Sequence, residues 1–122
     1  MVLKNLIVAL RTAFERPVTR RYPEYVFNFP PAYRGLHNLN RQRCIGCGIC
    51  AQQCPNNCIE IIRDGKLFPR IDVGHCMFCG ICLEVCPEQA LSWSRAFELA
   101  SWKRRDMIFS PAELSKSNDR GR

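Results

Sequence analysis

Cysteine recurs twice in one spaced pattern along this chain, and that repeat constrains the fold more than any other feature. Residues 44–55 read CIGCGICAQQCP and residues 76–87 read CMFCGICLEVCP. Nine of the 122 residues are cysteine, and only Cys58 stands outside the repeat. A chain of this length makes one small domain with extensions rather than a large enzyme with a roomy substrate pocket.

The cellular compartment determines whether cysteines form disulfides or bind metal. The count is odd, which argues against a complete disulfide framework. The apolar stretch at the N-terminus is interrupted by Arg11, and no small-residue cleavage site follows it, so we expect no secretory signal. Disulfides are rare in the cytosol. The cysteines are therefore expected to bind metal.

Both runs fit the spacing C-x2-C-x2-C-x3-C-P, which is typical of chains that bind [4Fe–4S] clusters. A cubane cluster needs four thiolates, and two residues between ligands let a tight loop wrap three of its corners. Three residues before the last cysteine make one helical turn, which directs that thiol away from its own loop. Zinc is the alternative for paired C-x2-C motifs, but zinc sites do not require the third cysteine and the Cys-Pro ending.

We expect each fourth cysteine to bind the cluster of the other half, as in two-cluster ferredoxins. This exchange would staple the halves together and let two [4Fe–4S] clusters take the place of an apolar core. The first cluster is assigned to Cys44, Cys47, Cys50 and Cys86, and the second to Cys76, Cys79, Cys82 and Cys54.

The remaining candidate residues have weaker roles. Cys58 aligns with Ala90 of the second half, so we expect it to pack as a small hydrophobic residue. His37 and His75 are not needed as ligands, although His75 precedes Cys76 and is a candidate to tune its cluster. No Ser/His/Asp set, phosphate loop or paired carboxylates are present in the sequence. We therefore expect no substrate site on this chain.

The pattern predicts an α+β, pseudo-twofold 2[4Fe–4S] ferredoxin-like domain over residues 44–93. Short strand-like stretches at 58–62 and 90–93 follow the two runs, and residues 64–66 predict a turn before a return strand at 67–73.

Three extensions flank this domain. Residues 1–17 predict an amphipathic helix suited to an interface. Residues 18–43 predict an extended arm rich in proline and aromatic side chains, which we expect another chain to cover. Residues 94–122 predict a helix at 94–104 and then a polar tail. The apolar stripe of the first helix consists of Leu3, Leu6, Ile7, Leu10 and Phe14.

Charge separates the flanks from the middle. The formal net charge is +7, and the flanks carry it, whereas the cysteine-bearing residues 44–86 are neutral to acidic. Basic flanks suit an acidic protein, an anionic membrane face or a nucleic acid. We expect no nucleic-acid partner, because the basic residues alternate with prolines and form no stripe.

The flanks also carry a family resemblance. Residues 16–19 (RPVT), 22–24 (YPE), 30–37 (PPAYRGLH), 72–80 (DVGHCMFCG) and 97–100 (FELA) resemble chain I of complex I and the equivalent subunit of energy-converting membrane-bound [NiFe] hydrogenases and related archaeal complexes. One departure is length, since only 21 residues separate Cys54 from Cys76 and complex I versions carry a longer linker.

The resemblance implies an electron-relay subunit of a membrane-bound, ion-translocating oxidoreductase. It would lie peripherally at the cytoplasmic face, beside a neighbouring iron–sulfur subunit and the large subunit of the peripheral arm. Its N-terminal helix would meet membrane-arm subunits, and an acidic ferredoxin is a candidate donor. A free soluble 2[4Fe–4S] ferredoxin is the alternative, although a stand-alone carrier needs neither the basic charge nor the arm.

Overall fold

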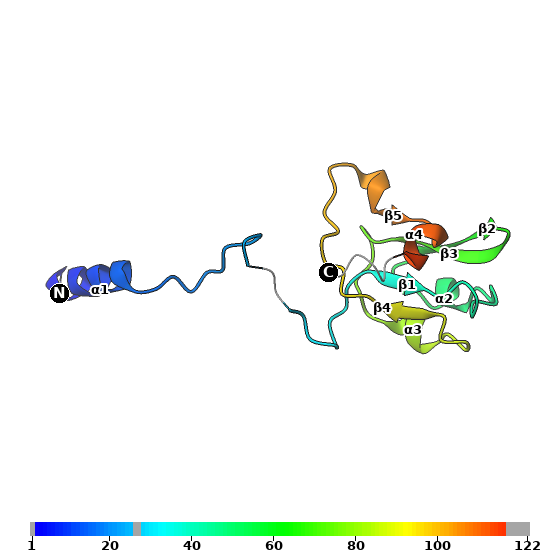
Figure 1. Cartoon of the computed structure of the whole chain (residues 1–122), viewed down its shortest axis with the longest axis horizontal. Helices are drawn as coiled ribbons and strands as arrows, with labels where there is room; N and C mark the ends of the chain where they lie inside the picture. The colour runs from blue at the N-terminus through cyan, green and yellow to red at the C-terminus, as the bar shows by residue number, and fades with distance from the viewer. Residues whose placement is uncertain (1, 26–27, 117–122) are drawn as a thin grey trace.

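Two small antiparallel sheets frame the cysteine-bearing part of the chain (Figure 1). The computed structural model describes residues 2–25 and 28–116. In the first sheet, β1 (His37–Leu39) pairs with β4 (Leu91–Trp93), so that His37 lies opposite Trp93. The sheet therefore joins the segment before the first cysteine run to the segment after the second.

The second sheet follows the predicted hairpin. Strand β2 (Ile59–Asp64) turns at Gly65 into β3 (Lys66–Asp72), and the two pair along their whole length. The short strand β5 (Ile108–Phe109) adds to the far end of β3. The strands and the turn predicted after the first run are confirmed, as is the strand predicted after the second.

Two one-turn helices occupy equivalent places in the cysteine runs. Helix α2 (Ile49–Gln52) begins after Gly48, and α3 (Ile81–Glu84) begins after Gly80. The two helices pack against each other between the sheets. They connect the third cysteine of each run to the fourth, so their packing brings the two halves of the repeat together.

The helix predicted over residues 94–104 is wrong. Leu36 donates from its backbone N–H to the carbonyl of Ala96 at 3.0 Å, and Gly35 donates to that of Ser94 at 3.1 Å. These bonds continue the β1–β4 pairing past Trp93, with a bend at residue 95 in place of a helix. A side chain at position 35 would clash, because its Cβ would lie 2.4 Å from the Ser94 oxygen. Helical structure in the described tail is confined to η1 (Arg104–Met107) and α4 (Pro111–Ser115).

A compact apolar core lies between the sheets and α4. Leu36, Ile71 and Leu114 are fully buried in it. Helix α4 is fixed by a capping box, in which Ser110 accepts from the Glu113 backbone and the Glu113 carboxylate accepts from the Ser110 backbone. The tail thus closes the core, and the polar residues beyond 116 fall outside the described part of the chain.

The N-terminal segment forms α1 (Val2–Phe14), which Figure 1 places away from the sheets. The described side chains of residues 3–25 are exposed. Part of the arm packs on the chain itself, since Phe29 stacks on Tyr33 at 4.2 Å between ring centroids and lies 4.8 Å from Phe97. The aromatic arm is thus partly covered from within the chain, while Phe27 lies outside the described residues.

Candidate iron–sulfur sites

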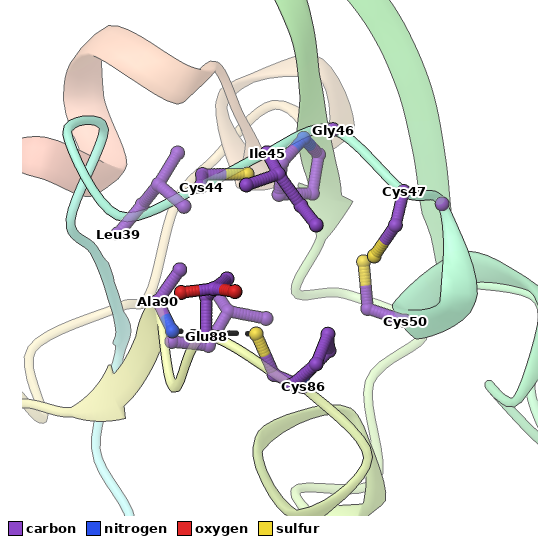
Figure 2. A pocket seen from close by; sticks show the side chains of 13 residues that line it. Leu39, Cys44, Ile45, Gly46, Cys47, Cys50, Cys86, Glu88 and Ala90 are labelled. Carbon is purple, nitrogen blue, oxygen red and sulfur yellow. Dashed lines mark hydrogen bonds between the residues drawn. The ribbon is translucent and has the colours of Figure 1, made fainter.

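The first pocket brings together cysteines from both halves of the repeat. Figure 2 shows three cysteines of the first run around this pocket and Cys86 reaching it from the opposite side. Apolar residues such as Leu39 and Leu91 complete the lining, together with Glu88. The four cysteines are the ones that sequence spacing groups into the first set: Cys44, Cys47, Cys50 and Cys86.

Local backbone geometry shapes the loop around this pocket. Gly46 has a φ of 74°, in the left-handed region. A Cβ at that position would lie 2.7 Å from the backbone oxygen of Leu67, so glycine also allows β3 to approach the loop. On the other side, the Ala90 N–H donates to the Sγ of Cys86 at 3.3 Å.

The second pocket has the complementary composition. It is lined by three cysteines of the second run and by Cys54 of the first, with Cys58 and His37 beside them. The Phe78 N–H donates to the Sγ of Cys76 at 3.4 Å, which is the kind of bond that stabilises a thiolate. The four cysteines of the second predicted set are thus gathered here: Cys76, Cys79, Cys82 and Cys54.

Burial favours the protonated form of three of these thiols when no cation is near. It raises the pKa of Cys50 to about 11 and that of Cys82 to about 12, and the charges of the neighbouring thiolates add to the effect. Burial also raises the pKa of Cys76, against the hydrogen bond from Phe78. Soft cations replace such protons, so a metal cluster is the group that these pockets fit.

Cys58 lies closer to the second pocket than its alignment with Ala90 suggested. The side chain is buried, as expected of a small hydrophobic residue, but its Sγ lies 3.3 Å from that of Cys54. Burial raises the pKa of Cys58; the same contact, together with backbone N–H bonds, lowers the pKa of Cys54 against its own burial. The available signal was the spacing C-P-N-N-C, which places Cys58 one turn after Cys54.

The two histidines differ in environment. His37 is buried, its ring lies 4.5 Å from that of Trp93, and burial lowers its pKa to about 4. His75 is exposed and is held by Asp72 at 3.4 Å and by Arg104 at 3.1 Å. His37 therefore packs against the second pocket as a neutral ring, while His75 stands outside it beside Cys76.

In residues 2–25 and 28–116, no three His, Cys, Asp or Glu side chains lie close enough together to bind a single metal ion. No helix in the same residues is both long enough and apolar enough to cross a membrane.

The chain matches one family model and is similar to subunits of respiratory oxidoreductases. Residues 37–92 match the 4Fe–4S dicluster domain. The NADH-quinone oxidoreductase subunit I of Pectobacterium atrosepticum is 39% identical over an alignment of 137 positions. The alignment covers 93% of this chain and 76% of that protein. The F420H2 dehydrogenase subunit I of Methanosarcina mazei is 46% identical over 63 residues, which cover 52% of this chain and 36% of that one.

The fold is also similar to that of a chain in a solved respiratory complex. A chain of the membrane-bound sulfane sulfur reductase, an archaeal respiratory membrane complex, superposes with a TM-score of 0.67 at 37% identity. The match covers 82% of this chain and 56% of the solved one, so this chain spans just over half the length of that neighbour.

Proposed function

The chain belongs to the family of subunit I of NADH-quinone oxidoreductase, and we propose that it relays single electrons through two [4Fe–4S] clusters within a membrane-bound, ion-translocating respiratory complex. The dicluster domain holds the two clusters, which supply one-electron chemistry when bound. The chain's own part is to hold them, exclude water and fix their surroundings.

The ligand sets follow the two pockets. We assign the first cluster to the cysteines of the first pocket, including Cys86, and the second to those of the second pocket, including Cys54. The exchange of the fourth ligand is supported by the packing of α2 on α3, which carries each fourth cysteine toward the other half. Cys58 and the two histidines are left outside both sets.

The two proposed sites are adjacent. Cys50, of the first set, lies on α2 and Cys82, of the second, lies on α3, and these two helices pack against each other. Adjacent sites within one domain are what an electron relay requires, because the transfer then needs no movement of the chain.

We further propose that the domain is pseudo-twofold. Each run places a glycine with positive φ before its short helix, with φ values of 76° at Gly48 and 91° at Gly80. Each helix then leads through its fourth cysteine and a proline to a strand, β2 in the first half and β4 in the second. The same order of elements in both halves supports a common ancestral unit.

The extensions are proposed to dock the chain onto its complex. The apolar side chains of α1 are open to solvent, with Leu6 57% and Phe14 88% exposed. A stripe of this kind suits membrane-arm subunits or the bilayer surface, which would place the chain peripherally at the cytoplasmic face. The domain would then meet a neighbouring iron–sulfur subunit and the large subunit of the peripheral arm.

Chemistry on substrates is proposed to take place in other subunits. We assign no catalytic residue to this chain, because the cysteines that line its two pockets are the proposed cluster ligands. The basic charge would favour docking of an acidic donor such as a ferredoxin, in which case turnover should fall as ionic strength rises.

The observation that carries this proposal is the grouping of four cysteines from both halves in each pocket, in a chain of this family. The test is to tag the chain in its native cell, extract membranes with detergent and separate the extract by size. We expect the tag to migrate with a large complex that contains iron and inorganic sulfide. Recovery only as a free species near 14.1 kDa would favour the alternative, a diffusible ferredoxin.

A further inference from the structure

The two cysteine loops, residues 44–50 and 76–82, differ at two positions, and at one of them the backbone conformation is unusual. Gly46 of the first loop corresponds to Phe78 of the second, and both residues have positive φ, 74° and 52°. Glycine adopts this left-handed conformation freely, whereas a bulky side chain there is strained. The second loop therefore needs support that the first does not.

Arg34 provides that support. Its Nη1 donates to the carbonyl oxygen of Phe78 at 2.9 Å and to that of Cys79 at 2.7 Å. The Phe78 ring lies 6.0 Å from the rings of His37 and Trp93, so the side chain is also packed. Among the described residues, no side chain makes an equivalent bond to the carbonyls of the first loop. Arg34 thus ties the arm to the second loop alone.

The same arginine makes the two pockets electrostatically unequal. Glu88, an exposed acidic residue, is one of the residues that line the first pocket. None of the described residues that line the second pocket carries a carboxylate, and the guanidinium of Arg34 lies just outside it, where a Cβ at position 80 would be 3.9 Å from Arg34 Cζ. A reduced cluster carries one more negative charge than an oxidised one, so a nearby cation stabilises it and a carboxylate destabilises it.

We propose that Arg34 is a positioning residue that holds the second cysteine loop in its strained conformation and raises the reduction potential of the second cluster above that of the first. The inference rests on the ligand assignment proposed above. With the higher reduction potential, the second cluster would hold a single electron at equilibrium. The residue that sets this difference in potential, Arg34, lies in the arm and outside the cysteine runs.

The test uses the purified complex and a redox titration followed by electron paramagnetic resonance of both clusters. Arg34→Gln removes the charge and keeps a donor. Because Arg34 is exposed, its field is screened by solvent, and we expect the one-electron equilibrium constant of the second cluster to fall by about threefold to tenfold, tenfold being about 59 mV. Arg34→Lys should recover most of the loss, because it restores the charge. The first cluster should not move.

Arg41→Gln is the matched control. Arg41 also bonds a backbone carbonyl and a carboxylate, both of Asp64, but it lines neither pocket. Its substitution should leave both potentials unchanged. Equal shifts in the Arg34→Gln and Arg41→Gln proteins would overturn the proposal, because they would reflect net charge alone.

A second variant covers the case in which Arg34→Gln does not assemble. Phe78→Gly removes the backbone strain, so the double variant Phe78→Gly/Arg34→Gln should assemble and still show the lowered second potential relative to Phe78→Gly. An unchanged second potential with native iron content overturns the role of Arg34. Absence of iron and sulfide from the unmodified chain would instead defeat the proposed function, so the two failures are distinguishable.

Discussion

The Sγ of Cys58 lies 3.3 Å from the Sγ of Cys54, although only Cys54 belongs to a proposed ligand set. Cys58→Ala removes one buried sulfur, and we expect native iron content with a loss of about 1–2 kcal/mol in stability. Iron and sulfide analysis together with denaturant titration measure both. Cys54→Ala is the contrasting variant and should lose the second cluster. Loss of iron in Cys58→Ala would make Cys58 a ligand.

Cys86 lines the first pocket although it lies in the second run. Cys86→Ser should therefore damage the cluster held by Cys44, Cys47 and Cys50, because serine offers a harder ligand than a thiolate. Electron paramagnetic resonance of the variant should show an altered first-cluster signal and an intact second one. Loss of the second-cluster signal alone would refute the exchanged ligation.

Gly46 cannot carry a side chain without moving β3. A Cβ there would lie 2.7 Å from the Leu67 oxygen, and the φ of 74° adds strain. Gly46→Ala should therefore cost about 2–3 kcal/mol and lower the occupancy of the first cluster. Gly65→Ala is a suitable control, since it has a similar φ of 78° but no neighbour within 4 Å of the added Cβ. Equal iron loss in both variants would show that close packing at position 46 is unimportant.

The burial of His37 predicts acid sensitivity. Its pKa is lowered from 6.5 to about 4 by burial, so below pH 6.5 the unfolded chain binds a proton that the folded chain does not. Stability from this residue is present above pH 6.5 and is lost as the pH falls toward 4, by up to about 3 kcal/mol. The rate of loss of cluster absorbance should rise over this window, and His37→Phe should weaken that dependence. An identical pH profile in the two proteins would contradict the prediction.

The exposed stripe of α1 predicts a role in assembly rather than in cluster binding. Deleting residues 1–16 should leave both clusters in place and loosen the chain from its membrane partners, which co-purification measures. Leu6→Asp should have the same effect because it puts a charge on the stripe, whereas Asn5→Asp adds the same charge beside it and should not. Unchanged recovery of Leu6→Asp with membrane subunits would rule out docking through this face.

Much of the domain could be predicted because its constraints are local. The spacing of the cysteines sets loop and helix lengths, and the Asp64–Lys66 turn separates two strands that contain isoleucine, leucine and phenylalanine among charged residues. The membership of the two pockets also followed from spacing, since Cys54 and Cys86 lie at equivalent positions. These features depend on neighbours in the sequence, which a single sequence displays.

The rest depends on contacts between distant segments. Residues 94–96 are not helical because Gly35 and Leu36 bond to their backbone, and no pattern within the tail indicates that pairing. The contact of Cys58 with Cys54 was hidden by the alignment of Cys58 with Ala90. The link between Arg34 and the second loop joins residues 44 and 45 positions apart. Local propensity carries no information on such pairs.

The presence of Cys86 in the first pocket bears on when the protein can mature. When only the first run has been synthesised, the nascent chain contains three of the thiolates proposed for that site. Its fourth cysteine, Cys54, is proposed to bind the other cluster. Neither cube can be enclosed until translation has passed the second run. We expect insertion of iron and sulfide to follow synthesis of nearly the whole domain, with a half-made chain unable to retain either cofactor.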